Sequence, residues 1–203
     1  MLMTDVTGLF SHALALAALG AVCIPTRTNV PTRIALIVAS FAVAWLPVNG
    51  LPLAAYPRGM VGDLSITACV LLVLSILRGA GATAPWLDAS RAFGGRRVAW
   101  CLGIALLALM FYVMALGAST LDPYRWGYAS YALVGAVGGI ACFAWWQRAW
   151  VVATSVTLAL LAWTAGWYES SNLWDYLLDP LLAVYALGVV VKRAVDVVTG
   201  RVT

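Results

Sequence analysis

The sequence predicts an all-α integral membrane protein, built as a polytopic bundle of about seven transmembrane helices. Its 203 residues are 64% hydrophobic and only 10% charged, whereas a soluble globular domain is usually about 45–50% apolar and about 25% charged. The mean hydropathy of +0.94 points the same way. Apolar runs long enough to cross about 30 Å of hydrocarbon recur along the whole chain. Together these observations place the chain among the integral membrane proteins.

The predicted spans come from runs that approach the roughly 20 residues needed to cross a bilayer. They are 8–24, 33–48, 63–79, 98–117, 123–146, 149–167 and 176–192. The third is interrupted by Arg78, whose long side chain can reach the interface. We expect one transmembrane domain over residues 1–203 and no soluble domain.

The distribution of basic residues predicts the orientation of the bundle. With the N-terminus outside, all but two of the twelve Lys and Arg residues lie on the inner side, and the exceptions are Arg58 and Arg125. This is the asymmetry that the positive-inside rule describes, and it is lost if the third span is removed. Lys192 is the only lysine, a bias typical of high-GC bacterial genomes. We therefore predict a multi-pass protein of the bacterial inner membrane with a cytoplasmic C-terminus.

Two sets of small residues predict close helix packing. Gly135 and Gly139 form a GxxxG pattern, and Ala13, Ala17 and Ala21 form a seam on the first span. Small side chains let helix backbones approach each other in lipid, where no hydrophobic effect drives them together. For both sets we favour packing within the monomer over a dimer interface.

Acidic residues gather at the predicted outer ends of the spans. The candidate outward-facing polar cluster consists of Asp63, Asp122, Glu169, Asp175 and Asp179. Aspartate is a preferred helix N-cap, and its charge faces the positive end of the helix dipole. Proline directly after it suits the first helical position. We therefore expect Asp63 and Asp122 to cap the third and fifth spans.

Asp179 repeats the Leu-Asp-Pro sequence of Asp122 in a different context. A helix that starts at Pro180 has only about 13 residues before Lys192, too few to span. We expect a helix from about Asn172 to Trp174 onward, with a kink or re-entrant break at Pro180 and Asp179 below the surface. A sunken carboxylate beside a broken helix is a functional-site hypothesis. Pairing with an arginine, or capping of the broken helix, is an equal alternative.

The two outer arginines, Arg58 and Arg125, are candidates for anion binding or for ion pairs. A cation in the first turn of a helix opposes the dipole, so Arg125 in particular needs a nearby negative charge. Arginine also binds phosphate or carboxylate in a bidentate manner. Structural ion pairs with the outer acids and an outward-facing anion pocket are both consistent with the sequence.

The sequence lacks the residues that several kinds of functional site require. His12 is the only histidine, which argues against a bis-histidine haem or a histidine-based zinc site. No phosphate-binding loop or nucleophile elbow occurs, and the four scattered cysteines suit small buried hydrophobes. A Mg²⁺ or Ca²⁺ site from the outer aspartates requires four loops to converge. We therefore predict no cofactor and no metal. We also predict no nucleic-acid partner, because the basic residues behind the net charge of +4 reflect the orientation of the chain in the membrane.

Three functions are consistent with this sequence. The first is a non-catalytic subunit or scaffold that contacts membrane lipids and an integral membrane partner, or forms a homo-oligomer. The second is a transporter or channel that uses Asp179 at a broken helix, with Thr154, Ser155 and Thr157 along its path. The third is an enzyme acting at the outer face on a lipid-linked or phosphorylated substrate, which Arg58 and Arg125 would hold.

Overall fold

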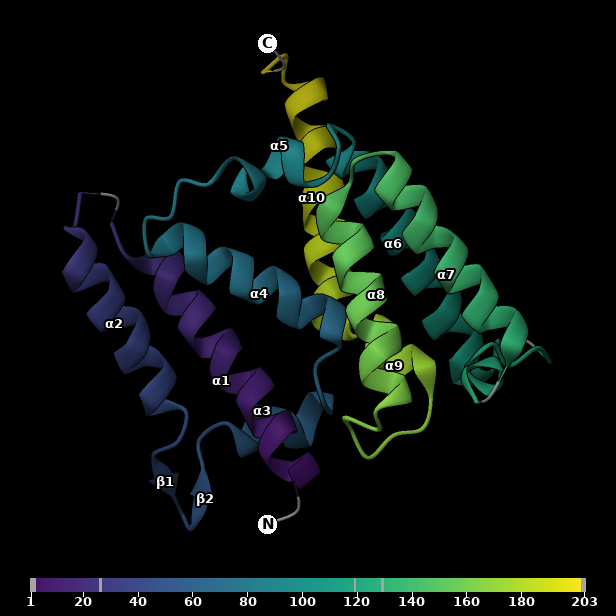
Figure 1. Ribbon diagram of the computed structural model, residues 1–203, viewed down its shortest axis with the longest axis horizontal. Helices are drawn as coiled ribbons and strands as arrows, with labels where there is room; N and C mark the ends of the chain where they lie inside the picture. Colours follow the sequence, from purple (N-terminus) through teal and green to yellow (C-terminus); the bar gives the residue numbers. More distant parts are fainter. Residues whose placement is uncertain (1–2, 26, 119, 129, 202–203) are drawn as a thin grey trace.

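The computed structural model describes residues 3–25, 27–118, 120–128 and 130–201, and it is mostly helical (Figure 1). The long helices are α1 (Met3–Cys23), α2 (Val30–Val43), α4 (Ile66–Gly79), α6 (Arg97–Val113), α7 (Tyr131–Trp146), α8 (Trp150–Thr164) and α10 (Pro180–Val198). The short elements are β1 (Pro47–Val48), β2 (Leu51–Pro52), α3 (Ala55–Val61), η1 (Pro85–Leu87), α5 (Ala89–Ala92), η2 (Met114–Ala118), η3 (Tyr124–Gly127) and α9 (Leu173–Leu177). The predicted helical class is confirmed.

The helices differ in their capacity to cross a membrane. Within the described ranges, two segments are long and apolar enough to cross a membrane, judged by length and composition alone. They are Asp5–Cys23 and Arg97–Gly117. Helices α2, α4, α7 and α8 are apolar but shorter, at 10–17 residues. The helical bundle is thus established, whereas the seven spans remain a proposal.

Each predicted span overlaps one long helix, but three boundaries differ clearly. Helix α2 ends at Val43, before residue 48, and α10 runs from Pro180 to Val198 where 176–192 was predicted. Helix α7 begins at Tyr131 and not at Pro123, and its N-cap is Ser130, whose hydroxyl accepts from the Leu133 N–H at 3.3 Å. Asp122 therefore does not cap this helix. The preceding residues form only the single 3₁₀ turn η3.

The helices pack as neighbouring pairs around α4. Helix α1 packs against α2 and α4, α4 against α8, α8 against α7, and α10 against α6. Figure 1 shows α4 crossing the middle of the molecule between α1 and α8. Although α6 and α7 follow each other in the chain, the contact between them in the described residues is made by side chains, with the rings of Trp100 and Phe143 6.0 Å apart. Long helices alternate in direction, and the chain's N-terminus lies at the end opposite its C-terminus (Figure 1).

The two sets of small residues have different environments. Ala13, Ala17 and Ala21 are buried, and a Cβ on Gly79 of α4 would lie 2.5 Å from the Ala21 Cβ. The predicted seam on α1 is therefore confirmed. For the GxxxG pattern, the favoured packing within the monomer is not found, because a Cβ on Gly135 or Gly139 would meet nothing within 4 Å. That face of α7 is open.

The first turns of α4 and α10 are recessed from the end of the bundle. In Figure 1 both begin well inside the outline, above α3 and the loop that joins α8 to α9. Three of the acidic residues that the sequence places at the outer side, Asp63, Asp175 and Asp179, lie at this recess.

Candidate functional site

Asp179 joins the first turns of two long helices. Its Oδ1 accepts from the Leu182 N–H at 2.7 Å, so it caps α10 with Pro180 in the first turn. Its Oδ2 accepts from the Ser65 N–H at 2.7 Å. Ser65 itself caps α4, because its hydroxyl accepts from the Ala68 N–H at 3.0 Å. Asp179 is only 3% exposed, so one buried carboxylate holds the starts of α4 and α10 together.

The chain is broken at Asp179 as predicted. Asn172 caps α9, which ends at Leu177, and Leu178 and Asp179 are extended before α10 begins. Of the alternatives left open for Asp179, capping of the broken helix is the one that the geometry shows.

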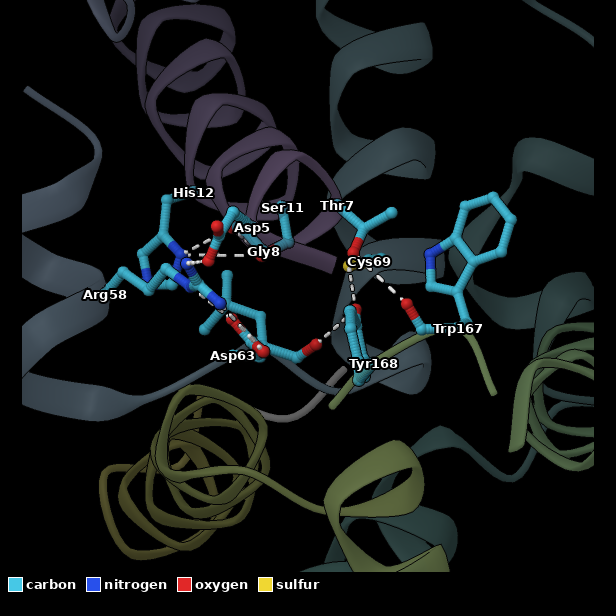
Figure 2. A network of polar contacts seen from close by, with 11 residues as sticks. Asp5, Thr7, Gly8, Ser11, His12, Arg58, Asp63, Cys69, Trp167 and Tyr168 are labelled. Atoms are coloured by element: carbon cyan, nitrogen blue, oxygen red, sulfur yellow. Dashed lines mark hydrogen bonds and ion pairs between the residues drawn. The ribbon is translucent and has the colours of Figure 1, made fainter. Parts of the chain in front are cut away.

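Arg58 lies between two carboxylates from different elements (Figure 2). Its Nε donates to Asp63 Oδ1 at 2.6 Å, and its Nη1 donates to Asp5 Oδ1 at 3.3 Å. The hydrogen bond to Asp63 raises the pKa of the Arg58 guanidinium, and burial opposes this in part. Asp63 is therefore an ion-pair residue and not the predicted N-cap, since Ser65 caps α4. Three segments, α1, α3 and the start of α4, are connected by these pairs.

Gly8 lets α1 approach this ion-pair cluster. A Cβ at Gly8 would lie 2.1 Å from Asp63 Oδ1 and 2.4 Å from Arg58 Nε. The neighbouring His12 is buried, with Nδ1 3.1 Å from the Gly8 carbonyl oxygen. Figure 2 shows His12 beside Arg58. A larger residue at position 8 would force the Asp63 or Arg58 side chain to move.

Asp175 and Asn172 fasten the η3 loop to α9. The Tyr124 hydroxyl donates to Asp175 Oδ2 at 2.9 Å. Asn172 is fully buried and donates from Nδ2 to the Tyr124 carbonyl at 2.9 Å. Trp174 Nε1 donates to the Pro123 carbonyl at 2.9 Å. The loop that carries Asp122 is thus held by side chains from the other Leu-Asp-Pro region.

Two buried tyrosines attach the loop between α8 and α9 to the start of α4. The Tyr168 hydroxyl donates to the Leu64 carbonyl at 2.7 Å, and the Tyr176 hydroxyl accepts from the Tyr168 N–H at 3.0 Å. Burial raises the pKa of Tyr168, so its hydroxyl keeps the proton that it donates. Thr7 of α1 donates to the Trp167 carbonyl at 3.2 Å, which ties this loop to the first helix as well (Figure 2).

Part of the predicted polar cluster converges on one cavity of about 340 Å³. Asp63, Asp175 and Asp179 line it, and its walls are aromatic, formed by Phe111, Tyr112, Tyr124, Tyr168 and Trp174. Among the described residues no arginine lines this cavity. A cavity lined by three carboxylates, with no basic residue among its described lining residues, does not suit an anion.

The remaining predicted site residues lie elsewhere. Glu169 lines a neighbouring cavity of about 540 Å³, which shares Tyr168 and Ser170 with the first. Asp122 is exposed, and its Oδ1 accepts from the Tyr124 N–H at 3.0 Å. Arg125 is exposed too, with no ion pair in the part of the chain that the structure describes. Arg58 and Arg125 therefore do not form one anion site.

The arrangement of the described carboxylates was compared with that of a metal centre. Across the described ranges, no group of three or more His, Cys, Asp or Glu side chains is arranged to hold a metal ion. The structure thus gives no support to the Mg²⁺ or Ca²⁺ alternative, although three of its four aspartates share a cavity.

Several contributors were not singled out from the sequence. Ser65 comes two residues after Asp63, which looks like the N-cap of α4 in the sequence. Only the observed start of α4 shows that Ser65 is the cap. Gly127 was also missed; a Cβ there would lie 1.6 Å from Asn172 Oδ1, which makes glycine necessary. Tyr168 carries no local signal, because its partner Leu64 is 104 residues away.

Comparisons with protein-family models, with curated proteins and with solved structures found no match.

Proposed function

We propose that the chain is a multi-pass protein of the bacterial inner membrane that crosses the bilayer seven times, with the N-terminus outside. In this proposal it acts as a non-catalytic subunit or scaffold of a membrane assembly. The alternating direction of the long apolar helices supports the crossings. The basic residues of the loop between α4 and α6 suit the cytoplasmic side.

The non-catalytic proposal rests on one observation: the polar residues of the recess are hydrogen-bonded or ion-paired to other parts of the chain. Asp179 accepts from backbone N–H groups at the starts of α4 and α10. Arg58 forms ion pairs with both Asp5 and Asp63. Asp175 accepts from the Tyr124 hydroxyl. Helix ends buried without partners are costly, so these groups have a structural role where they are. A catalytic acid or nucleophile needs a general base or an electrostatic partner free to serve the reaction.

The open face of α7 supports a partner in the membrane. Gly135 and Gly139 are exposed, as are the large side chains Ile140 and Phe143 on the same helix. Small residues beside large ones allow a second helix to approach closely in lipid. An integral membrane partner or a second copy of this chain fits this face, and lipids fit the rest of the apolar surface.

The enzyme and transport alternatives have less support. An enzyme that holds a phosphorylated substrate with Arg58 and Arg125 is disfavoured, because neither lines the carboxylate cavity. Transport keeps one supporting feature, the broken helix at Asp179. Against the predicted path, Thr154 and Thr157 are exposed on the outside of α8, and only Ser155 is buried.

Purification from native membranes in a mild detergent tests the proposal. We expect a stoichiometric membrane partner or a defined homo-oligomer, measured by mass and by size-exclusion chromatography. The double substitution Gly135→Leu and Gly139→Leu should release it, whereas Ala39→Leu on the exposed face of α2 should not. A monodisperse single chain at native expression level would count against the subunit proposal.

A further inference from the structure

The carboxylate cavity of about 340 Å³ carries more negative charge than the described part of the chain neutralises. Asp175 and Asp179 line it, and neither forms an ion pair with a described residue. Asp63 lines it as well, but it shares Arg58 with Asp5, so these three side chains together carry a net charge of −1. A charge that is removed from water without a counter-charge is costly. The cavity therefore favours a positively charged occupant.

The helix dipoles offset the charge of Asp179 alone. Its two oxygens accept from N–H groups at the starts of α10 and α4. Each helix N-terminus acts as about half a positive charge, so two of them balance about one carboxylate. Asp175 accepts from the hydroxyls of Tyr124 and Ser170, which are neutral. The charge of Asp175 and the net charge of the Asp63 group therefore remain.

The cavity opens between the end of α3 and the start of α10. Val61, Gly62 and Pro180 line it and are also exposed. Asp63 and Asp175 are half-buried, so neither is enclosed by protein as Asp179 is. In the proposed orientation this opening faces the outer solution, and a water-soluble cation can enter through it.

The walls of the cavity are aromatic, and this distinguishes an organic cation from a metal ion. Phe111 contacts Tyr124 and Trp174, with ring centroids 6.1 Å and 5.1 Å away, and Tyr112 and Tyr168 also line the cavity. Aromatic rings attract ammonium groups through their negative faces. Mg²⁺ and Ca²⁺ need about six to eight oxygen ligands instead, and the described acidic side chains are not arranged to hold a metal ion.

From these features we propose that the carboxylate cavity binds one small organic ammonium ion, an amine with an apolar body, from the outer solution. The ammonium group donates to the Asp175 carboxylate, a charge-assisted hydrogen bond, and the apolar body contacts the aromatic walls. A neutral molecule of the same shape leaves the negative charge uncompensated, and an anion is repelled by it. The volume falls within the range of about 300–1,000 Å³ that is usual for small-molecule sites.

This ligand is additional to the proposed subunit role and needs no partner protein. The hydrogen bonds that Asp175 and Asp179 make within the chain stay in place, because each carboxylate oxygen can accept more than one hydrogen bond. A chain that retains its partner but does not bind an amine would contradict this inference alone.

Binding is tested with the full-length chain in lipid nanodiscs, with phenethylammonium as the probe and isothermal titration calorimetry as the readout. Empty nanodiscs correct for partition of the amine into lipid. We expect saturable binding of one probe per chain. The neutral 2-phenylethanol and the anionic 3-phenylpropionate should bind at least about tenfold more weakly, the loss expected for one hydrogen bond between charged groups. Equal binding of the alcohol, or full displacement of the probe by equimolar Mg²⁺, would overturn the proposal.

Two matched pairs of variants locate the site. Asp175→Asn keeps the side-chain shape and an acceptor for Tyr124, and it should weaken binding at least about tenfold. Asp122→Asn removes the charge of an outer aspartate that does not line the cavity, and it should leave binding unchanged.

The second pair tests the aromatic walls and serves if Asp175→Asn does not fold. Tyr112→Leu should weaken binding about three- to tenfold, the loss expected for one cation–π contact. Tyr131→Leu, on the exposed side of α7, should leave it unchanged. Equal binding by the two members of either pair would overturn the proposal.

Discussion

The two Leu-Asp-Pro regions share a sequence but have different structures. Asp179 is buried and accepts from two backbone N–H groups, one on α4 and one on α10. Asp122 is exposed and, among the described residues, accepts from the Tyr124 N–H two residues later, a local turn. A long helix follows Pro180, whereas a single 3₁₀ turn follows Pro123. The local signal for a cap is therefore the same, and the tertiary partners decide whether it starts a helix.

The η3 loop shows why its turn does not continue into α7. The carbonyls of Pro123 and Tyr124 accept from the side chains of Trp174 and Asn172. A continuing α-helix would aim these carbonyls along its axis at residues four positions later. Gly127 packs directly on Asn172, which fixes the loop in this position. The second Leu-Asp-Pro region thus determines the conformation of the first.

Asp179→Ala should have the largest effect on the free energy of unfolding. It leaves two buried N–H groups unpaired and removes the charge that both helix dipoles favour, a loss of about 3–5 kcal/mol. Asp179→Asn keeps one acceptor oxygen and should lose roughly half as much. Unfolding by denaturant or heat in detergent measures both. A loss below about 1 kcal/mol for the alanine variant would mean that Asp179 does not hold the two helices.

Gly127→Ala should have the second largest effect on the free energy of unfolding, because the added Cβ would lie 1.6 Å from Asn172 Oδ1. Asn172 is buried and cannot move without losing its bond to Tyr124. We expect a loss of about 2–3 kcal/mol, typical of overpacking. Gly103→Ala is the matched control, since its Cβ meets nothing and alanine favours a helix. A wild-type melting temperature for Gly127→Ala would contradict the loop contact.

Arg58→Met should destabilise the chain by about 1 kcal/mol, since ion pairs with partly exposed side chains contribute little. The Arg58 side chain is 21% exposed and has two partners. Arg125→Met should have no effect, because the structure describes no ion pair for Arg125. Thermal unfolding at low and high salt distinguishes the two arginines, because only the ion pairs of Arg58 should weaken as salt is added. Equal losses at the two sites would show that Arg125 has a partner.

Asp122→Ala should have the smallest effect, about 0.5 kcal/mol or less, because one exposed local hydrogen bond is lost. It is the direct counterpart of Asp179→Ala, and the same unfolding measurement applies. If the two alanine variants lost equal stability, the difference between the regions would have no energetic basis.

Much of the fold could be predicted because it depends on local chemistry. The apolar runs located the helices. The break before Pro180 was predicted too, although the expectation of a short helix after it is wrong, since α10 has 19 residues and ends at Val198. The buried alanine seam on α1 also follows from small residues at helical spacing. Each of these properties is contained in a continuous stretch of sequence.

The site could be predicted only in part, because its contacts join distant segments. Asp179 and Ser65 are 114 positions apart, and no pattern in either stretch shows that they meet. The same holds for the open face of Gly135 and Gly139, whose exposure depends on where α6 packs.

The placement of the bundle in the membrane, with the carboxylate recess outside, is the central proposal, and cysteine labelling tests it most directly. The free cysteines Cys23, Cys69, Cys101 and Cys142 are first replaced by alanine. Single cysteines are then introduced as Ser171→Cys, beside the recess, and Ser90→Cys, in the short helix α5 between α4 and α6. A membrane-impermeant maleimide should label the first in intact spheroplasts and the second only after the membrane is permeabilised. Labelling of both, or the reverse pattern, would contradict the seven-span topology.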